Sequence, residues 1–179
     1  MKVRIDHIRE VTRELSFSEP VESFPVLVAM VVSGECVFDG PVQATLTAGR
    51  EMDHYRVEGT VSVPFRQTCS RCLASFEQHL SSRFTIFFRE GTPQTGEEEE
   101  VELAEQDLVS AVFSGEELDL LPEIGEQVAL AVPLKPLCSE QCKGLCPLCG
   151  ADLNTTECGC SREPVNLKFA ALKDFKVQR

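Results

Sequence analysis

The segment 138–160, CSEQCKGLCPLCGADLNTTECGC, contains six of the nine cysteines of this 179-residue chain. Its other residues are mostly small or polar, so it has too few large apolar side chains to fold around a hydrophobic core. In a reducing compartment, closely spaced cysteines are more often metal ligands than disulfides, because cellular thiols reduce disulfides while a metal binds thiolates. This segment therefore predicts a small region that is folded by bound Zn2+.

The spacing within the segment identifies one pair of ligands. Cys146 and Cys149 form a C-x2-C turn, in which two thiolates can converge on one ion, and Gly150 lets the backbone turn beneath them. A tetrahedral site needs a second pair, which could be Cys138 with Cys142 (C-x3-C) or Cys158 with Cys160 (C-x-C). Spacing leaves both alternatives open, and closure of a ribbon-like loop slightly favours the downstream pair.

A further C-x2-C pair, Cys69 and Cys72, lies far upstream. Its flanks, VEGTVSVPF and FEQHLSSRFTIFF, alternate apolar and polar residues as strands do, which predicts that the pair lies at or near the tip of a β-hairpin. The eight cysteines would suffice for two four-thiolate sites, but one Zn2+ bound by four of them, with the rest as spare thiols, is the favoured interpretation. Cys36, in a short valine-rich stretch, is expected to be an ordinary buried thiol.

Four segments of the first half predict β-strands, because they are apolar or alternating runs separated by Gly, Asp and Pro. They are residues 25–32, 42–48, 54–65 and 80–88. Residues 103–120 are ambiguous between a short helix and a pair of strands, whereas LLPEIGEQVALAVP at 120–133 predicts a helix that covers one face of the sheet. The expected fold class is α+β: an antiparallel sheet or open barrel covered by one or two helices, with a small C-terminal cysteine-rich zinc-binding segment.

This organisation predicts two regions along the chain. Residues 1–134 would form the mainly antiparallel β domain, with an acidic loop near 91–107. Residues 135–179 would contain the zinc-binding cysteine cluster and a basic amphipathic terminal helix.

Acidic residues are concentrated in the middle of the chain. Residues 90–134 contain 13 of the 29 acidic residues and none of the 17 Lys and Arg, and they account for the net charge of −12. Such a run is usually a solvated loop that aids solubility. The functional alternative is an acidic arm, centred on Glu97, Glu98, Glu99 and Glu100, that attracts a basic partner and repels phosphate. Arg71 lies outside this run, between two cysteines, and could make one oriented contact with a carboxylate or phosphate of a partner.

The sequence does not favour an enzyme. A nucleophilic cysteine needs a nearby base, and the three histidines, His7, His54 and His79, lie far from the cysteine-rich segment in the sequence. An all-cysteine zinc site is usually closed and structural, whereas a catalytic site keeps one position open. The N-terminus MKVRIDHIRE has no signal-peptide pattern and no stretch reaches roughly 18 apolar residues. We therefore expect a cytoplasmic protein with no membrane partner and no small-molecule substrate.

Four motifs occur in a fixed order along most of the chain: CSRCL at 69–73, EELDL at 116–120, E-x-x-x-L-A-x-P at 126–133, and CKGLCPLCGADLN at 142–154. In this combination the chain resembles the YceD family, also called the large ribosomal RNA subunit accumulation proteins. The resemblance implies a role in accumulation or assembly of the large ribosomal subunit. The chain departs from the family after the last cysteine, where Glu163 and Pro164 are followed by Val165 instead of the arginine that the family often carries.

The expected function follows from this resemblance. It implies a ribosome-biogenesis factor that supports accumulation of large-subunit rRNA, by binding a basic ribosomal protein or the rRNA itself without catalysis. Some family members lack most of the C-terminal cysteines, which implies that Cys69, Arg71 and Cys72 are closer to what the family shares. The alternative is a zinc-stabilised protein-interaction or regulatory module that is unrelated to ribosomes.

Overall fold

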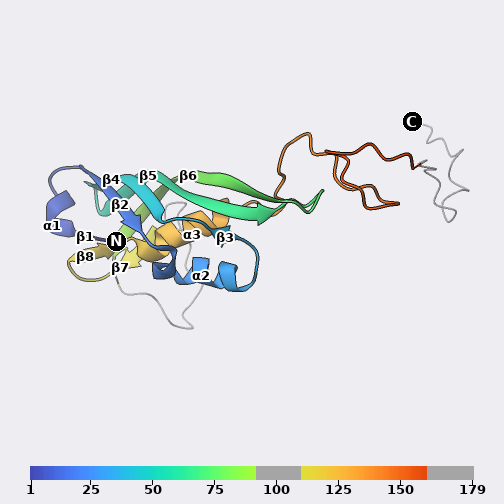
Figure 1. The fold of residues 1–179 in the computed structure, drawn as a ribbon. Helices are drawn as coiled ribbons and strands as arrows, with labels where there is room; N and C mark the ends of the chain where they lie inside the picture. Colours follow the sequence, from blue (N-terminus) through green and yellow to red (C-terminus); the bar gives the residue numbers. More distant parts are fainter. Residues whose placement is uncertain (92–109, 161–179) are drawn as a thin grey trace, which may run out of the picture.

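A mixed β-sheet forms the centre of the molecule, and the computed structural model describes residues 1–91 and 110–160 (Figure 1). The strand order is β2-β4-β5-β6-β7, and the short strand β3 also pairs with β5. The strands are β2 (Arg13–Glu19), β3 (Val37–Phe38), β4 (Val42–Glu51), β5 (His54–Thr68), β6 (Ser75–Glu90) and β7 (Ser110–Phe113). All pairs in this sheet are antiparallel except β6 with β7, which is parallel. A second sheet of two antiparallel strands joins β1 (Lys2–Arg4) to β8 (Glu117–Asp119).

Alternating side chains give the main sheet one buried face. In β5 the residues Val57, Val61, Val63 and Phe65 are buried, while Arg66 beside them is exposed. Two helices, α2 (Pro25–Val32) and α3 (Leu121–Ala131), contact each other and cover this face, with α3 packed against β5 and β6 (Figure 1). Two shorter helices precede them, α1 (Ile5–Ile8) and the 3-10 turn η1 (Val21–Ser23). The α+β class, the covering helix near 120–133 and the strands at 42–48, 54–65 and 80–88 are confirmed.

Helix α2 corrects the prediction of a strand at residues 25–32. An eight-residue apolar run shows no periodicity that separates a buried strand from a buried helix. Pro25 occupies the first turn of the helix, where its missing N–H needs no partner and its fixed φ suits the helix. The helix packs against α3 at Gly125, where a Cβ would lie 3.1 Å from a methyl carbon of Val26. Tertiary packing therefore decides the conformation of this run.

The ambiguous segment 103–120 contains strands where it is described. Strands β7 and β8 do not pair with each other: β7 lies beside β6, and β8 lies beside β1. The parallel pairing of β7 also makes the sheet mixed, whereas the sequence predicted antiparallel strands. The expected acidic loop near 91–107 and the basic terminal helix lie almost wholly outside the described residues.

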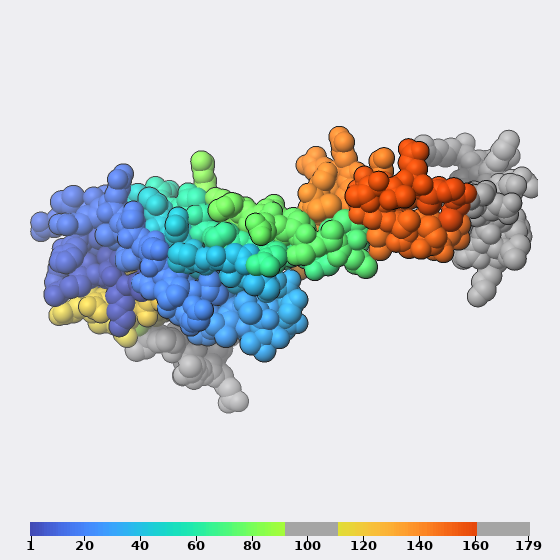
Figure 2. All heavy atoms as spheres, in the orientation of Figure 1, coloured from blue at the N-terminus to red at the C-terminus, as the bar shows by residue number. Residues whose placement is uncertain are grey.

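The hairpin of β5 and β6 is the longest feature of the fold. Its pairing extends from His54 opposite Arg89 to Thr68 opposite Ser75, and its tip reaches beyond the helices (Figure 1). Residues 135–160 meet this tip, so the molecule is elongated, with a broad body and a narrow arm (Figure 2). The N–H of Ser70 donates to the carbonyl of Pro136 at 2.8 Å, which joins the tip to the segment that follows α3.

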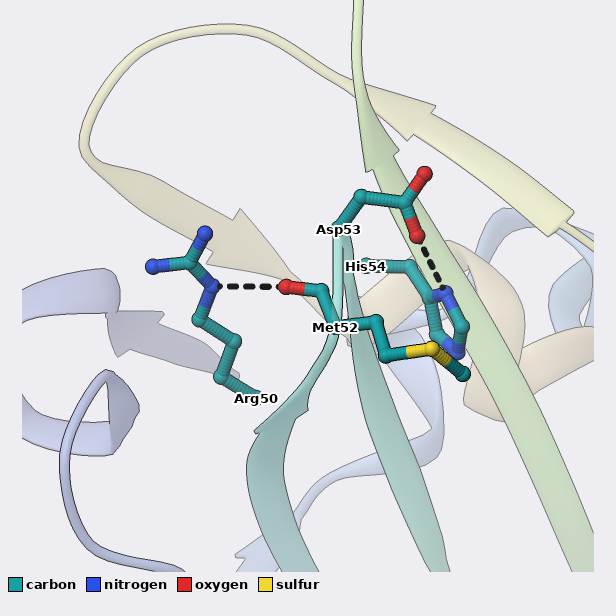
Figure 3. Close-up of polar contacts among 4 residues, drawn as sticks. All are labelled: Arg50, Met52, Asp53 and His54. Carbon is teal, nitrogen blue, oxygen red and sulfur yellow. Dashed lines mark hydrogen bonds and ion pairs between the residues drawn. The ribbon is translucent and has the colours of Figure 1, made fainter.

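At the opposite end of β5, Met52 and Asp53 form the turn that follows β4, and His54 begins β5 (Figure 3). Met52 has a left-handed φ of 54°, and its carbonyl accepts a hydrogen bond of 3.0 Å from Nε of Arg50. The Nδ1 atom of His54 lies 3.2 Å from Oδ1 of Asp53, and its ring stacks edge-on against Phe87 at 5.1 Å. His54 is thus separated from the hairpin tip by the length of β5, on the order of 50 Å at about 3.3 Å per residue.

Candidate metal centres

Eight of the nine cysteines form two groups of four, and in each group the four sulfur atoms lie within 4.8 Å of one another. The first group is Cys69, Cys72, Cys138 and Cys142, and the second group is Cys146, Cys149, Cys158 and Cys160. Four ligands at about 2.3 Å around a tetrahedral zinc ion would be about 3.8 Å apart. The sulfur pairs Cys69–Cys142 and Cys72–Cys138 are separated by 3.8 and 3.6 Å. Both groups could therefore hold a metal ion.

Both cysteine pairs that the sequence spacing left as alternatives belong to a group of four, but to different groups. Cys146 and Cys149 lie with the downstream C-x-C pair, and the upstream C-x3-C pair lies instead with the hairpin tip. This arrangement favours two four-thiolate sites over a single site with spare thiols. Cys36 stands apart from both groups: it is buried in the main core, and burial raises the pKa of its thiol.

The first group is built on the turn between β5 and β6. The N–H of Cys69 donates to the carbonyl of Ala74 at 2.9 Å, and the N–H of Leu73 donates back to the carbonyl of Cys69 at 2.9 Å. The N–H of Arg71 points at the sulfur of Cys69 at 3.5 Å. Leu73 closes the turn with a left-handed φ of 59°. This residue is 64% exposed.

The second group repeats this turn with a glycine in the strained position. The N–H of Cys146 donates to the carbonyl of Ala151 at 2.8 Å, and the N–H of Gly150 donates to the carbonyl of Cys146 at 2.9 Å. Gly150 has a φ of 73°, so it corresponds to Leu73 of the first turn. The two C-x2-C motifs therefore fold as the same turn in different surroundings.

Arg71 joins the two halves of the first group. Its Nη1 atom donates to the carbonyl oxygens of Cys142 at 2.9 Å and Glu140 at 3.3 Å, and its own carbonyl accepts from the N–H of Leu145 at 3.1 Å. The guanidinium thus has partners within this chain, which the sequence did not indicate. A contact of Arg71 with another molecule stays a prediction. The other predicted partner residues, Glu97, Glu98, Glu99 and Glu100, lie outside the described residues.

Sequence reasoning also missed Asn154, whose Nδ2 atom donates to the sulfur of Cys142 at 3.4 Å. Asn154 lies in the chain segment of the second group, whereas Cys142 belongs to the first group. The signal was its place at the end of the motif CKGLCPLCGADLN, but the motif gave this amide no specific role, and asparagine is ordinary in turns.

Electrostatics in both groups favours thiolate at one cysteine and opposes it at another. The N–H of Cys138 is the main cause that lowers the pKa of Cys69 to about 6, and the N–H of Cys149 likewise lowers that of Cys146 to about 6. The neighbouring sulfur atoms raise the pKa of Cys138 and of Cys160 to about 12. Negative charge on all four sulfur atoms therefore requires a cation between them.

The family model described as "Large ribosomal RNA subunit accumulation protein YceD" matches residues 57–176. This is well over half of the chain, and it includes most of β5, all of β6 and all eight cysteines of the two groups. The chain belongs to the YceD family. The resemblance seen in the four sequence motifs is thereby confirmed.

Relatives in this comparison come from plants and bacteria. "Large ribosomal RNA subunit accumulation protein YCED homolog 1, chloroplastic" of Arabidopsis thaliana is 25% identical over 158 residues, which cover 77% of this chain and 49% of the relative. The maize protein of the same description is 26% identical over 72% of this chain and 50% of its own length. An uncharacterised protein of Mycobacterium bovis is 33% identical over 119 residues, 66% of this chain and 54% of that protein.

The chain thus spans about half the length of the curated relatives it matches. No solved structure matches it. Within residues 1–91 and 110–160, no helix combines the length and the hydropathy that crossing a membrane would require.

Proposed function

We propose that this chain is a ribosome-biogenesis factor that supports accumulation of large-subunit rRNA, by binding a ribosomal protein or the rRNA without catalysis. The family match carries the proposal, because the family is named for this role and the matched region contains most of the hairpin and both cysteine groups. The plant relatives carry the same description in their names. Reduced cysteine groups suit a reducing compartment, and we propose that the protein acts in the cytoplasm.

We propose Zn2+ as the ion of both groups. Four thiolates without nitrogen or oxygen donors favour soft or borderline metals, and Zn2+ accepts a tetrahedral sulfur set without a redox change. The first ion would be held by Cys69, Cys72, Cys138 and Cys142, and the second by Cys146, Cys149, Cys158 and Cys160. An ion held by four thiolates stabilises the folded state, and it has no open coordination position for an activated water.

A basic ribosomal protein is the partner that the charge distribution favours. In residues 110–134 the acidic side chains of Glu116, Asp119 and Glu126 are exposed, and this stretch contains no Lys or Arg. Burial, and then the charge of Glu126, raises the pKa of Glu123, as expected where carboxylates lie close together. Exposed carboxylates attract cationic chains and repel phosphate over a Debye length of about 8 Å at physiological salt, although Lys2 and Arg4 of the paired strand β1 lie opposite those of β8.

The biological role is tested by removing the protein from cells. Sedimentation profiles at low growth temperature should show a reduced large-subunit peak, and the ratio of large-subunit to small-subunit rRNA should fall. Expression of the full chain should restore both. A normal large-subunit peak in the deletion strain would contradict the proposal and favour an interaction module unrelated to ribosomes.

The partner is tested by binding kinetics with basic proteins extracted from purified large subunits. Replacement of Glu97, Glu98, Glu99 and Glu100 by glutamine should slow association and flatten its dependence on salt, since rim charges act mainly on the on-rate. An unchanged on-rate would indicate that the acidic arm serves solubility and does not attract the partner. Crosslinking in cells that recovers rRNA fragments instead of a basic protein would assign the partner as RNA.

A further inference from the structure

The two cysteine groups are adjacent in the chain and in space. Only residues 143–145 separate Cys142 of the first group from Cys146 of the second. Gly144 in this connector has a left-handed φ of 73°, and a Cβ at this position would lie 3.1 Å from the carbonyl oxygen of Arg71. Together with the hydrogen bond from Leu145 to Arg71, this close approach holds the start of the second group against the turn of the first.

The loop of the second group folds back on the same connector. The N–H of Leu153 donates to the carbonyl of Gly144 at 2.9 Å, and Leu145 forms an antiparallel bridge with Asp152. The two ends of this loop carry the ligands Cys149 and Cys158. An ion in the second group would therefore fix both ends of the loop that lies against the connector.

Asn154 links this loop directly to a sulfur atom of the first group. Its Nδ2 atom donates to Sγ of Cys142 at 3.4 Å and to Oδ1 of Asp152 at 2.7 Å. Its Oδ1 atom accepts from the N–H of Lys143 at 2.8 Å. The backbone N–H of Asn154 also donates to Oδ1 of Asp152 at 2.9 Å, so the amide is held in this orientation from two sides.

A hydrogen bond to a thiolate stabilises its negative charge and orients the ligand. Removal of such an outer partner typically lowers metal affinity by about 10- to 100-fold. The unusual feature here is that the donor to Cys142 belongs to a loop whose ends are ligands of the other group.

We propose that the two groups bind metal cooperatively, with Asn154 as the positioning residue that couples them. This inference rests on the proposal that both groups bind Zn2+. Loading of the second group orders the loop and presents the Asn154 amide to Cys142. Loading of the first group fixes Cys142 and the connector on which the loop folds. Because coupling of binding is reciprocal, each ion raises the affinity for the other by the same factor.

The test uses the full chain, reduced and metal-free, titrated with Zn2+ against a chromophoric chelator of known affinity. The wild type should bind two ions. At half saturation, few molecules should carry only one ion. A Cys149→Ser, Cys160→Ser double variant retains only the first group, and its affinity should be about 10-fold or more below that of the first group in the doubly loaded protein. Equal affinity in these two proteins would overturn the inference.

Asn154→Ala is the variant that isolates the coupling. It should still bind two ions, but the affinity of the first group should fall by about 10- to 100-fold and the two steps should become independent. Thr156→Ala is the matched control, because Thr156 is exposed in the same loop and only its backbone N–H is seen to bond, to Asp152. Wild-type coupling in the Asn154 variant would exclude this residue as the link.

Titration with Co2+ gives a readout that does not depend on stability. Charge-transfer absorbance of the first group should change in the Asn154→Ala protein and stay unchanged in the Thr156→Ala protein. If neither group of the wild type binds metal, the proposed zinc sites and this inference are both wrong. Two independent ions in the wild type would overturn only the inference.

Discussion

The two cysteine groups contain the same turn but differ in how much chain they join. In the first group, Cys69 and Cys142 are 73 positions apart and both are buried, with exposures of 0 and 4%. The second group lies wholly within residues 146–160, and its Cys149 is exposed. The first group therefore connects the β-sheet to the C-terminal segment, whereas all four members of the second lie within one short stretch of chain. A similar motif contributes differently to stability according to the length of the loop that it closes.

The largest expected effect comes from breaking each group in turn. Cys142→Ser should release residues 135–160 from the hairpin tip, and loss of the crosslink should cost about 4 kcal/mol, by the chain-entropy relation for a loop of roughly 70 residues. Cys149→Ser opens a loop of roughly 15 residues, worth about 3 kcal/mol by the same relation, and should leave the tip attached. Hydrogen exchange at residues 68–75 distinguishes the two, since Cys142→Ser should increase exchange there far more than Cys149→Ser does. Equal exchange in both variants would contradict the comparison.

The connector between the groups should be the next most sensitive position. Gly144→Ala places a Cβ at a left-handed φ of 73° and 3.1 Å from the carbonyl of Arg71, so it should destabilise the arm by about 1–3 kcal/mol. Gly159 is the matched control, because a Cβ there has no atom within 4 Å and its φ is not left-handed. Denaturant unfolding of the metal-loaded variants measures both. A Gly144→Ala protein as stable as Gly159→Ala would show that the connector is not held tightly.

The equivalent turn positions should respond in opposite directions. Leu73→Gly relieves a left-handed conformation that costs an L-residue about 1–2 kcal/mol, and it removes little buried surface because Leu73 is 64% exposed. We expect it to stabilise the first turn by up to about 1 kcal/mol after the entropy of glycine is included. Gly150→Ala should destabilise the second turn by about 1 kcal/mol. Thermal unfolding of the two variants checks the signs, and a destabilising Leu73→Gly would indicate a packing role for this leucine.

The last expected effect is a pH dependence that both groups share in the metal-free, reduced protein. The pKa of Cys69 and of Cys146 is lowered from 9.0 to about 6, so each thiolate favours the folded state. That contribution is present above pH 9 and is lost as the pH falls through about 6. Thiolate absorbance should therefore show two ionisations near pH 6, and Cys69→Ser should remove one of them. Absence of any ionisation below pH 8 would show that the contacts of the backbone N–H groups with sulfur are lost without metal.

Local pattern predicted much of this fold. Alternation identified the strands that became β4, β5 and β6, and helical spacing identified α3. The same method assigned residues 25–32 to a strand, because an unbroken apolar run has no period that separates the two conformations. The parallel pairing of β7 with β6 was not predictable, since it joins segments that are separated along the chain.

By itself, the sequence determined the two C-x2-C turns, the suitability of their thiols as metal ligands, and the position of Cys69 and Cys72 at the end of a hairpin. Only the tertiary structure decided which pairs meet, and it also placed Arg71 and Asn154 around Cys142. The reason is that spacing within a turn is a short-range property of the backbone. The meeting of Cys72 with Cys138, 66 positions away, depends on where a long hairpin ends and where the chain leaves α3.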